Sequence, residues 1–459
     1  MHRTVVLLVV GLTGELVGEA TPSLAALARE GAARALRTIL PAVTCSVQST
    51  LVTGLLPRDH GVVANGWYFR DLSEVWLWRQ SNRLVAGEKV WEAALQRDPA
   101  FTCAKLFWWY NMHSAATWSV TPRPMYPADG RKIPDVYTQP AELRDELNAR
   151  LGQFPLFRFW GPATDLVASR WIADCARHVY DTKRPTPLTL VYLPHLDYNL
   201  QRLGPGHPAI AQDLRAVDAL CGELIAHARR DGTRVVVLSE YGITPVTGAI
   251  HVNRALREAG LIQVRTELGL ELLDPGASEA FAVADHQIAH VYVRRPERVP
   301  EVNRLLEGLP GVERVLDEDG KRAAGLDHPR SGELVAVARP DRWFTYYYWL
   351  DDARAPDFAR TVDIHRKPGY DPVELFLDPA LRVPEASVGW RLAKKALGFR
   401  YLLDVIPLDA SLVKGSHGRP TDDLAAGPLV ISSEPGLLPD GPIDATEVKA
   451  LLLDHVFRA

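Results

Sequence analysis

Continuous apolar runs that alternate with helix patterns restrict the fold of this chain more than any other feature. The runs lie at residues 4–10, 188–193 and 234–238, and periodic helix patterns follow the first two at 23–30 and about 209–229. A strand that is apolar on both faces belongs to a parallel sheet covered by helices, because a half-solvated strand would alternate apolar and polar residues. The sequence therefore predicts an α/β fold with a mainly parallel sheet between two helix layers.

Three short segments directly follow these predicted strands. Functional side chains in open parallel sheets lie just after the carboxyl ends of the strands. The positions that this rule selects are Val10 with Gly11, the segment around Asp197, and the sequence SEYG at 239–242. We expect these segments to meet at one edge of the sheet.

A length of 459 residues, about three typical domain lengths, allows one elaborated domain or two, and we expect one over residues 1–433. Two insertions are expected in this domain. Residues from about 66 to 165 are rich in aromatic residues and proline, which favours irregular structure over one edge of the core. Residues from about 250 to 380 mix helices with strand-like runs such as 343–349 and are predicted to form a subdomain. A linker and a short helix are expected over 434–459.

Composition and charge exclude several classes of function. The formal net charge is −4, from 52 Lys and Arg against 56 Asp and Glu, without a basic block, so a nucleic-acid polymer is not an expected partner. The four cysteines show no CxxC pairing, which argues against a disulfide framework and a structural zinc site. Because no apolar stretch reaches the roughly 20 residues of a membrane span and no cleavable signal is evident, we expect a cytoplasmic protein without an integral membrane span.

The most informative segment is PAVTCSVQSTLVTG at 41–54, which PRDHG follows at 57–61. It resembles the nucleotide pyrophosphatase/phosphodiesterase branch of the alkaline phosphatase superfamily, in which a threonine opens a helix at this point. The resemblance implies that Thr44 is the nucleophile. A hydroxyl at a helix N-terminus suits this role, because the helix dipole and backbone N–H groups favour an incoming phosphate.

Further motifs resemble that family in the order of its sequence. They are the first strand with TPSL at 21–24, YLPHLD at 192–197, SEYG at 239–242 and GSHG at 415–418. The resemblance covers most of the chain. It implies a three-layer α/β/α sandwich of alkaline-phosphatase type with inserted subregions.

The metal-ligand positions depart from the family pattern. The family holds two metal ions through Asp and His side chains and the threonine, and this chain keeps three of these ligands: Thr44, Asp197 and His417. Four ligands are replaced, Asp by Val10, His by Gln201, Asp by Glu240 and His by Tyr241. Val cannot ligate an ion, whereas Glu240 is a carboxylate displaced by one methylene. The resemblance implies Asp197, Glu240 and His417 as metal ligands, but a two-zinc centre of the usual kind is not expected.

Other side chains are available as replacement ligands. Asp363 and His365 stand two residues apart, which points both to one side of an extended segment. Asp285 with His286, and His195 two residues before Asp197, are alternatives to that pair. Such ligands suit one or two divalent ions, and the sequence leaves zinc, manganese and magnesium open. A hydrogen-bonded loop without metal is the alternative interpretation.

Candidate substrate-binding residues are less specific. Asn65 and Asn111 are candidates for hydrogen bonds to a substrate, and Arg202 and Lys367 for stabilising phosphate charge. A solvated surface is the ordinary role of such cations. The aromatic run at 107–110 is expected either to line a pocket or to pack in the core.

Together these observations predict a metal-dependent hydrolase of phosphodiester or pyrophosphate bonds with a threonine nucleophile, acting on a small phosphorylated molecule. A catalytically silent member that binds a ligand or partner is one alternative, because ligands are lost. A hydrolase of another phosphorus or sulfate ester is the other, because a fold does not dictate a substrate. The sequence leaves the oligomeric state open.

Overall fold

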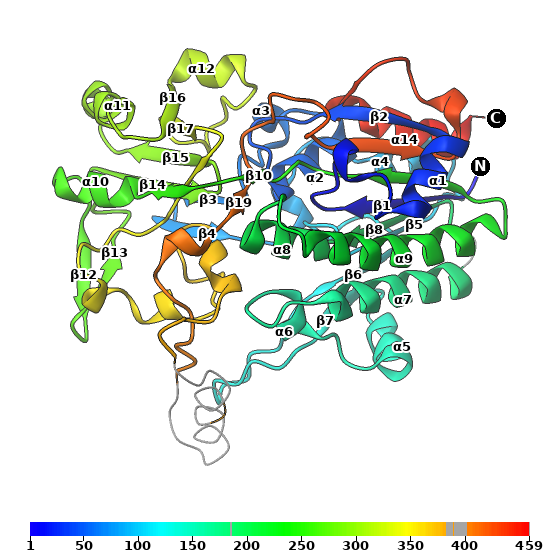
Figure 1. The fold of residues 1–459 in the computed structure, drawn as a ribbon, viewed down its shortest axis with the longest axis horizontal. Helices are drawn as coiled ribbons and strands as arrows, with labels where there is room; N and C mark the ends of the chain where they lie inside the picture. Colours follow the sequence, from blue (N-terminus) through cyan, green and yellow to red (C-terminus); the bar gives the residue numbers. More distant parts are fainter. Residues whose placement is uncertain (184–185, 382–388, 390–401, 459) are drawn as a thin grey trace.

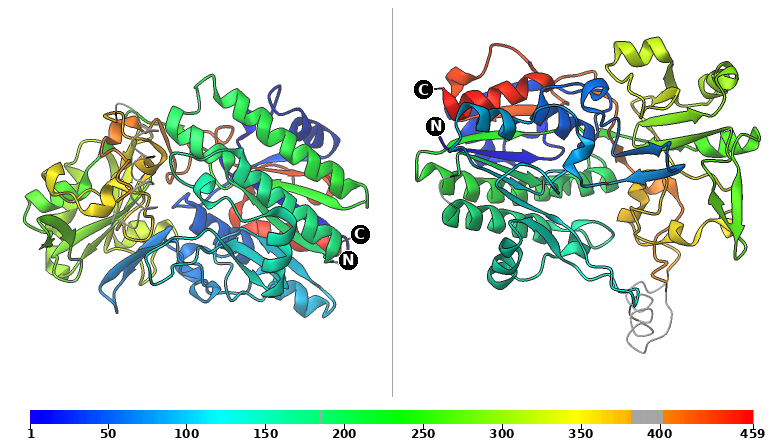
Figure 2. Two further views of the ribbon diagram at one scale, coloured as in Figure 1. Left: turned by 90° about the horizontal axis from the view of Figure 1, so that it is seen from below. Right: turned by 180° about the vertical axis from the view of Figure 1, so that it is seen from behind.

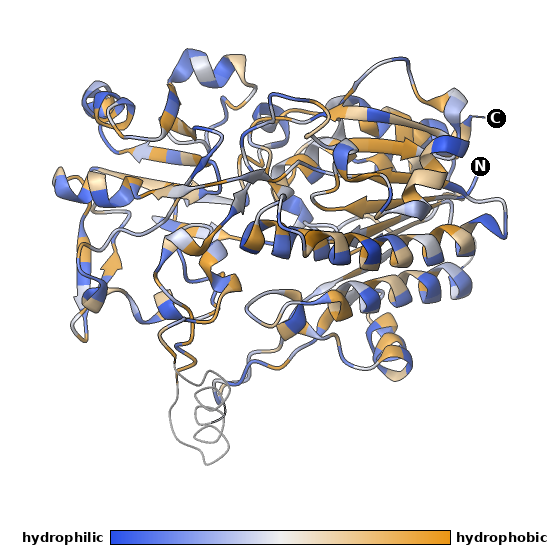
Figure 3. Ribbon diagram, in the orientation of Figure 1, coloured by the Kyte–Doolittle hydropathy of each residue, from blue (hydrophilic) through white to orange (hydrophobic). Residues whose placement is uncertain are grey.

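A nine-stranded sheet forms the centre of the larger part of the molecule (Figure 1). The computed structural model describes residues 1–183, 186–381, 389 and 402–458. In the middle of the sheet, β1 (Thr4–Val9) lies between β8 (Leu188–Leu193) and β9 (Arg234–Leu238) and runs parallel to both. Every residue of these three strands is buried. The predicted α/β class is confirmed, and the apolar runs are the central strands (Figure 3).

Strands from distant parts of the sequence extend the sheet on both sides. One side consists of β20 (Leu429–Ser432), β2 (Ala32–Arg37) and β21 (Ile443–Asp444). The other consists of β5 (Cys103–Leu106), β6 (Trp118–Pro122) and β7 (Val136–Gln139). The prediction of irregular structure for 66–165 was wrong at β5 to β7. β5 was missed because it contains Lys105, a residue that is rarely buried. The ammonium of Lys105 is buried here because it donates to the carbonyl oxygens of Trp109 and Tyr110 at 2.7 and 2.9 Å.

Helices cover both faces of the sheet (Figure 2). One face carries α1 (Pro22–Glu30), α7 (Leu166–Thr182), α8 (His195–Leu203) and α9 (Ile210–Arg229). The other face carries α2 (Thr44–Thr53), α4 (Val90–Arg97) and α14 (Val448–Phe457), and α14 contacts both of its neighbours. The short helix expected near the end of the chain is therefore part of the core. Three small helices complete this part: α3 (Pro57–His60), α5 (Glu142–Leu151) and α6 (Leu156–Phe159).

A second, antiparallel sheet lies beside the first and has its own hydrophobic core. Its strands, in spatial order, are β14 (Ala280–Asp285), β15 (Ile288–Val293), β17 (Leu334–Ala338) and β16 (Val312–Leu316). Its helices are α10 (Val252–Glu258), α11 (Val299–Glu307) and α12 (Glu318–Ala323). Four strand pairs flank the two sheets: β3 (Gly66–Phe69) with β4 (Glu74–Leu77), β10 (Thr244–Pro245) with β19 (Gly415–Ser416), β11 (Gly248–Ile250) with β18 (Arg342–Phe344), and β12 (Val264–Glu267) with β13 (Leu270–Leu273).

The strand expected over 343–349 ends at Phe344. The following aromatic side chains are all buried, so consecutive apolar residues imitated a buried strand. They pack against one another instead, with the rings of Tyr347 and Trp349 4.7 Å apart. No helix in the described part of the chain is both long enough and apolar enough to cross a membrane. All four cysteines are buried free thiols.

We expect His290 to make the protein less stable in acid. Its buried ring donates from Nε2 to the carbonyl oxygen of Val63 at 3.0 Å, and Nδ1 accepts from the Gly332 N–H at 3.2 Å. Burial lowers the pKa of His290 to about 4. The folded state therefore holds the neutral ring, and stability present above the unfolded pKa of about 6.5 is lost as the pH falls towards 4.

The measurement is urea unfolding of the wild type and His290→Gln at pH 7.5 and 4.5. The wild type should lose about 2 kcal/mol more on acidification than the variant, because only its side chain at 290 takes up a proton. Equal losses in the two proteins would show that His290 does not contribute.

Candidate active site

The first residue of α2 is Thr44, and its hydroxyl faces the carboxyl ends of the central strands. Val43 before it is extended, and the α2 residues are all buried. The closing GSHG segment lies alongside, because the N–H of Ala42 donates to the carbonyl oxygen of Gly418 at 2.8 Å. His417 donates from Nδ1 to the carbonyl oxygen of Ala42 at 2.8 Å, which leaves Nε2 as an acceptor. The motifs at 41–54 and 415–418 thus form one structure.

A phenol joins Thr44 to the carboxylate of Asp197. The hydroxyl of Tyr241 lies 3.0 Å from Thr44 Oγ1 and donates to Asp197 Oδ1 at 3.5 Å, the long limit of a hydrogen bond. Either hydroxyl can donate in the bond between Thr44 and Tyr241, and donation from Thr44 leaves the phenol proton for Asp197. Thr44 is 5% exposed and Asp197 9%, so the chain of hydroxyls is nearly closed to solvent. The segments after β8 and β9 meet here, as the strand-end rule predicts.

Glutamine amides hold both carboxylates of the site. Gln48 Nε2 donates to Glu240 Oε1 at 2.6 Å, and Gln201 Nε2 donates to Asp197 Oδ2 at 2.8 Å. The orientation of Gln48 is fixed, because its Oε1 accepts from the backbone N–H of Trp109 at 2.7 Å.

Gln48 was missed in the sequence, although it stands one helical turn after Thr44 on the same face of α2. Tyr370, also missed, fixes the other glutamine by donating from its hydroxyl to Gln201 Oε1 at 3.0 Å.

Four stacked rings fill the space beside these groups. Tyr241 lies on His417 with ring centroids 3.6 Å apart and planes at 7°. His417 lies 3.6 Å from His286, and His286 lies 3.7 Å from Tyr370. His286 comes from the turn between β14 and β15, where it has φ of 59°, so the second sheet reaches into the centre. We call this set of rings the ring column.

Burial changes the protonation of the site. It raises the pKa of Asp197 to about 7 and, together with the charge of Asp197, that of Glu240 to about 8. Hydrogen bonds from the glutamines oppose both shifts. Burial lowers the pKa of His417 to about 3, so this ring is neutral at physiological pH. Both carboxyl groups thus gain or lose a proton near neutral pH, and a pKa in this range is what a general acid or base requires.

The donor set does not fit the metal centre that the family resemblance implies. In residues 1–183, 186–381, 389 and 402–458, no three side chains of Asp, Glu, His or Cys converge on a point that would hold an ion. Asp197 Oδ1 and His417 Nε2, 4.0 Å apart, are one pair of suitable atoms. The glutamines direct N–H groups at the carboxylates, and Glu240 Oε2 has no partner among the described residues.

Asp285 and His286 lie at the site, but both carboxylate oxygens of Asp285 accept structural hydrogen bonds. It accepts from the N–H of Asn65 at 2.7 Å and from Asn65 Nδ2 at 3.0 Å. Asn65 Oδ1 in turn accepts from the N–H of Cys45 at 2.9 Å. Asn65, a candidate substrate ligand, therefore ties the β14–β15 turn to the first turn of α2. His195 faces α9 instead, with Nε2 3.3 Å from Asp213 Oδ1.

Asp363, His365 and Lys367 are not brought to Thr44. Lys367 is buried between two carboxylates, with Nζ 2.7 Å from both Asp371 Oδ2 and Glu374 Oε1. The N–H of Asp363 donates to Glu374 Oε1 at 2.9 Å, and His365 lines a separate cavity of about 410 Å³. The described contacts of Asp363 and His365 include neither Asp197 nor His417.

Asn111 and Arg202 make local structural contacts. Buried Asn111 donates to the carbonyl oxygens of Lys105 and Val120 at 2.9 and 2.8 Å. Arg202 Nε donates to Asn199 Oδ1 at 2.9 Å on the same helix.

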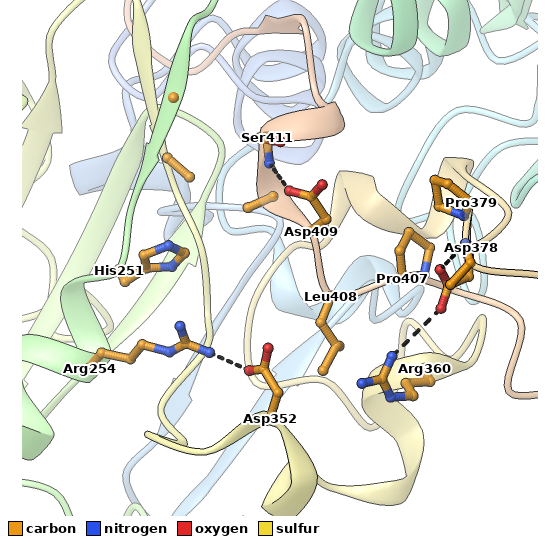
Figure 4. A pocket seen from close by; sticks show the side chains of 14 residues that line it. His251, Arg254, Asp352, Arg360, Asp378, Pro379, Pro407, Leu408, Asp409 and Ser411 are labelled. Carbon is orange, nitrogen blue, oxygen red and sulfur yellow. Dashed lines mark hydrogen bonds and ion pairs between the residues drawn. The ribbon is translucent and has the colours of Figure 1, made fainter.

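A larger cavity, of about 680 Å³, lies in the second part of the molecule (Figure 4). Two ion pairs lie in its walls: Arg254 lies 2.7 Å from Asp352, and Arg360 lies 3.8 Å from Asp378 (Figure 4). The predicted site residues do not line this cavity.

Comparison with known proteins gives one family match. Residues 4–371 match the model of the type I phosphodiesterase / nucleotide pyrophosphatase family. No curated protein sequence matches the chain.

Solved structures share the fold at low sequence identity. Murine ectonucleotide pyrophosphatase / phosphodiesterase 5 is 14% identical, with a TM-score of 0.59 over 99% of this chain and 95% of that chain. Phosphonoacetate hydrolase from Sinorhizobium meliloti 1021, in complex with phosphonoformate, is 15% identical, with a TM-score of 0.63 over 99% and 96% of the two chains. The predicted alkaline-phosphatase-type sandwich is confirmed, and the matches are consistent with the predicted class of phosphoric ester hydrolase.

Proposed function

The chain belongs to the type I phosphodiesterase / nucleotide pyrophosphatase family, and from that premise we propose that it hydrolyses a phosphodiester or pyrophosphate bond in a small phosphorylated molecule, with Thr44 as nucleophile. The observation that carries the proposal is the position of the Thr44 hydroxyl, at the N-terminus of α2 and 3.0 Å from the Tyr241 phenol. The murine relative is known in complex with AMP as an inactive threonine-to-alanine variant, and the bacterial one with phosphonoacetate. Four buried free thiols support a cytoplasmic location as a further part of the proposal.

In the first step, Thr44 Oγ1 bonds to phosphorus while the bond from phosphorus to the leaving oxygen breaks. The hydroxyl proton passes to Tyr241, whose own proton passes to ionised Asp197. The leaving oxygen takes a proton from Glu240, which its raised pKa of about 8 keeps protonated at neutral pH. The helix dipole at the N-terminus of α2 favours the negative charge of the bound phosphoryl group.

In the second step, water breaks the bond between Thr44 and phosphorus. The water oxygen bonds to phosphorus, the threonine oxygen leaves, and Asp197 returns its proton through Tyr241 to Thr44. Glu240 accepts the water proton and is ready for the next cycle. The products are a phosphomonoester and an alcohol from a phosphodiester, or two phosphate-bearing products from a pyrophosphate bond.

The family generally depends on divalent metal ions, with zinc in the ectonucleotide enzymes. In this proposal neither chemical step involves an ion, because Val10 and the two carboxylates that accept hydrogen bonds from glutamine amides do not fit such a centre.

A second candidate function is binding of a phosphorylated ligand or a partner without turnover. The observation that favours it is the ring column. Together with the glutamines that are hydrogen-bonded to the carboxylates, it fills the centre of the site. Such a protein would keep the fold and the anion-attracting end of α2, but would not release product.

Turnover of bis(p-nitrophenyl) phosphate tests the hydrolase proposal. We expect release of p-nitrophenol and, after an acid quench, a mass increase on the peptide containing Thr44. Binding of the diester without p-nitrophenol release would instead support the silent candidate. Absence of both would contradict the two proposals together.

We expect Tyr241→Phe to lower kcat by about 10²-fold, the size of one proton-transfer contribution. The variant keeps the ring that stacks on His417 but removes the hydroxyl that holds Thr44. Because the phenol is not assigned a substrate contact, KM and the melting temperature should change little. Steady-state kinetics with thermal unfolding separate these effects. A matching rise in KM at constant kcat would contradict the assigned role.

A further inference from the structure

We propose that the site around Thr44 binds no metal ion and is instead a hydrogen-bond network in which Tyr241 and two glutamines replace the ions of its family. The proposal concerns ion binding and is independent of whether the site turns over a substrate.

Two of the side chains that replace the family ligands, Val10 and Gln201, do not offer lone pairs to an ion. Buried Val10 lies at the end of β1, where the family has a carboxylate, and it offers no ligand atom. Gln201 stands where the family has an imidazole, and its N–H group, not a lone pair, faces Asp197 at 2.8 Å. A cation at this point would meet the positive end of the amide dipole.

The hydrogen-bond partners of Gln48 and Gln201 favour one orientation of each amide. Turning the Gln48 side chain by 180° would present Nε2 to the N–H of Trp109, which is a donor and cannot accept. Gln201 is oriented by Asp197, because a flip would turn Oε1 towards the acceptor oxygen Oδ2, which now receives the Nε2 hydrogen bond at 2.8 Å. The Tyr370 hydroxyl donates to Oε1 at 3.0 Å in the orientation present. Both carboxylates therefore face amide donors through bonds that support one another.

The Tyr241 hydroxyl lies between Thr44 and Asp197. It joins Thr44, at 3.0 Å, to Asp197, at 3.5 Å, and so connects two side chains that the family resemblance implies as metal ligands. The phenol ring is fixed on His417, with planes at 7°, and the stack continues through His286 to Tyr370. An ion bound by Thr44 would displace this hydroxyl and disrupt the ring column.

The test measures metal in the purified full-length protein. Wild type is dialysed against chelator, exposed to Zn²⁺, Mn²⁺ or Mg²⁺, desalted and analysed for metal by mass spectrometry, and its melting temperature is recorded with each ion. We expect substoichiometric metal and no shift in melting temperature. Bound ion at 100 times its Kd would multiply the folding equilibrium constant by about 100.

Two matched variants restore family ligands. Gln201→His adds an imidazole beside the pair Asp197 and His417 and should retain about one ion. The fourfold variant Val10→Asp, Gln201→His, Glu240→Asp and Tyr241→His should retain more, with circular dichroism to verify its fold. If the fourfold variant does not fold, the single variant still makes the comparison.

One equivalent of metal in the wild type, lost in both Asp197→Asn and His417→Gln, would overturn the proposal. So would an ion-dependent rise in the wild-type melting temperature as large as that of Gln201→His. Hydrolysis of bis(p-nitrophenyl) phosphate is recorded separately in chelator. A metal-free but inactive protein contradicts the hydrolase and supports the present proposal, whereas a metal-loaded protein contradicts the present proposal whether or not it is active.

Discussion

Thr44→Ala should reduce kcat for bis(p-nitrophenyl) phosphate by about 10³-fold or more, because it removes the atom proposed to bond to phosphorus. The fold should survive, since Thr44 contributes a small side chain at the first position of α2 and the Tyr241 hydroxyl still donates to Asp197. Thr44→Ser keeps a hydroxyl at the same point and should retain measurable turnover. Steady-state kinetics on the three proteins provide the measurement.

Thr53→Ala is the matched control for this prediction. It makes the same substitution at the other end of α2, where the Thr53 hydroxyl donates to the carbonyl oxygen of Ser49 at 2.6 Å. We expect wild-type kcat from this control. Wild-type kcat in Thr44→Ala would mean that another group attacks phosphorus and that the assigned nucleophile is wrong.

Lys367→Met should lower the free energy of unfolding by about 3–5 kcal/mol, the usual cost of removing one member of a buried charged group. The lysine is 1% exposed, and its ammonium lies 2.7 Å from each of two buried carboxylates, those of Asp371 and Glu374. Methionine fills a similar volume, so the loss comes mainly from two carboxylates left without a cation. Urea unfolding at pH 7 measures the effect.

The neighbouring residue provides the control. Arg366 pairs with Asp357 at 2.9 Å, but both side chains are nearly half exposed, so Arg366→Met should cost less than about 1 kcal/mol. Adding Asp371→Asn and Glu374→Gln to Lys367→Met should recover part of the lost stability, because neutral amides remove the unpaired charges. A loss for Lys367→Met no larger than that for Arg366→Met would contradict the role of this buried cluster.

The sequence predicts the centre of the fold well and its periphery poorly, for identifiable reasons. β1, β8 and β9 are buried on both faces, so their apolar runs are unambiguous. The pattern of β5 is ambiguous, although all four of its residues are buried. The strand is short and contains Lys105, and the sequence does not show that backbone carbonyl groups accept hydrogen bonds from the buried ammonium. The prediction for the aromatic run at 343–349 is wrong in the opposite sense, because it placed a strand where there is mostly a loop. Packed rings in a loop produce the same apolar pattern as a buried strand.

The motifs of the family resemblance indicate which residues meet at the site but not how they interact. The structure brings together Thr44, Asp197 and His417, as the resemblance of their motifs to the family implies. The ring column joins His286 and Tyr370 to His417 through contacts between distant segments, which no spacing in the sequence reveals. The spacing of Asp363 and His365 is equally compatible with a ligand pair and with a loop, and only tertiary contacts separate the two.

The order of strands in the central sheet has a consequence for how the protein is made. β1 pairs with β8 and β9, and α2, which carries Thr44, contacts α14 at residues 448–457. The first-made segments therefore leave the ribosome long before their neighbours exist. Folding that depends on such distant pairings is slow and exposes apolar strands in the meantime. We expect the active site to assemble only after these late segments have been made, and production of the protein to depend on temperature and on chaperones.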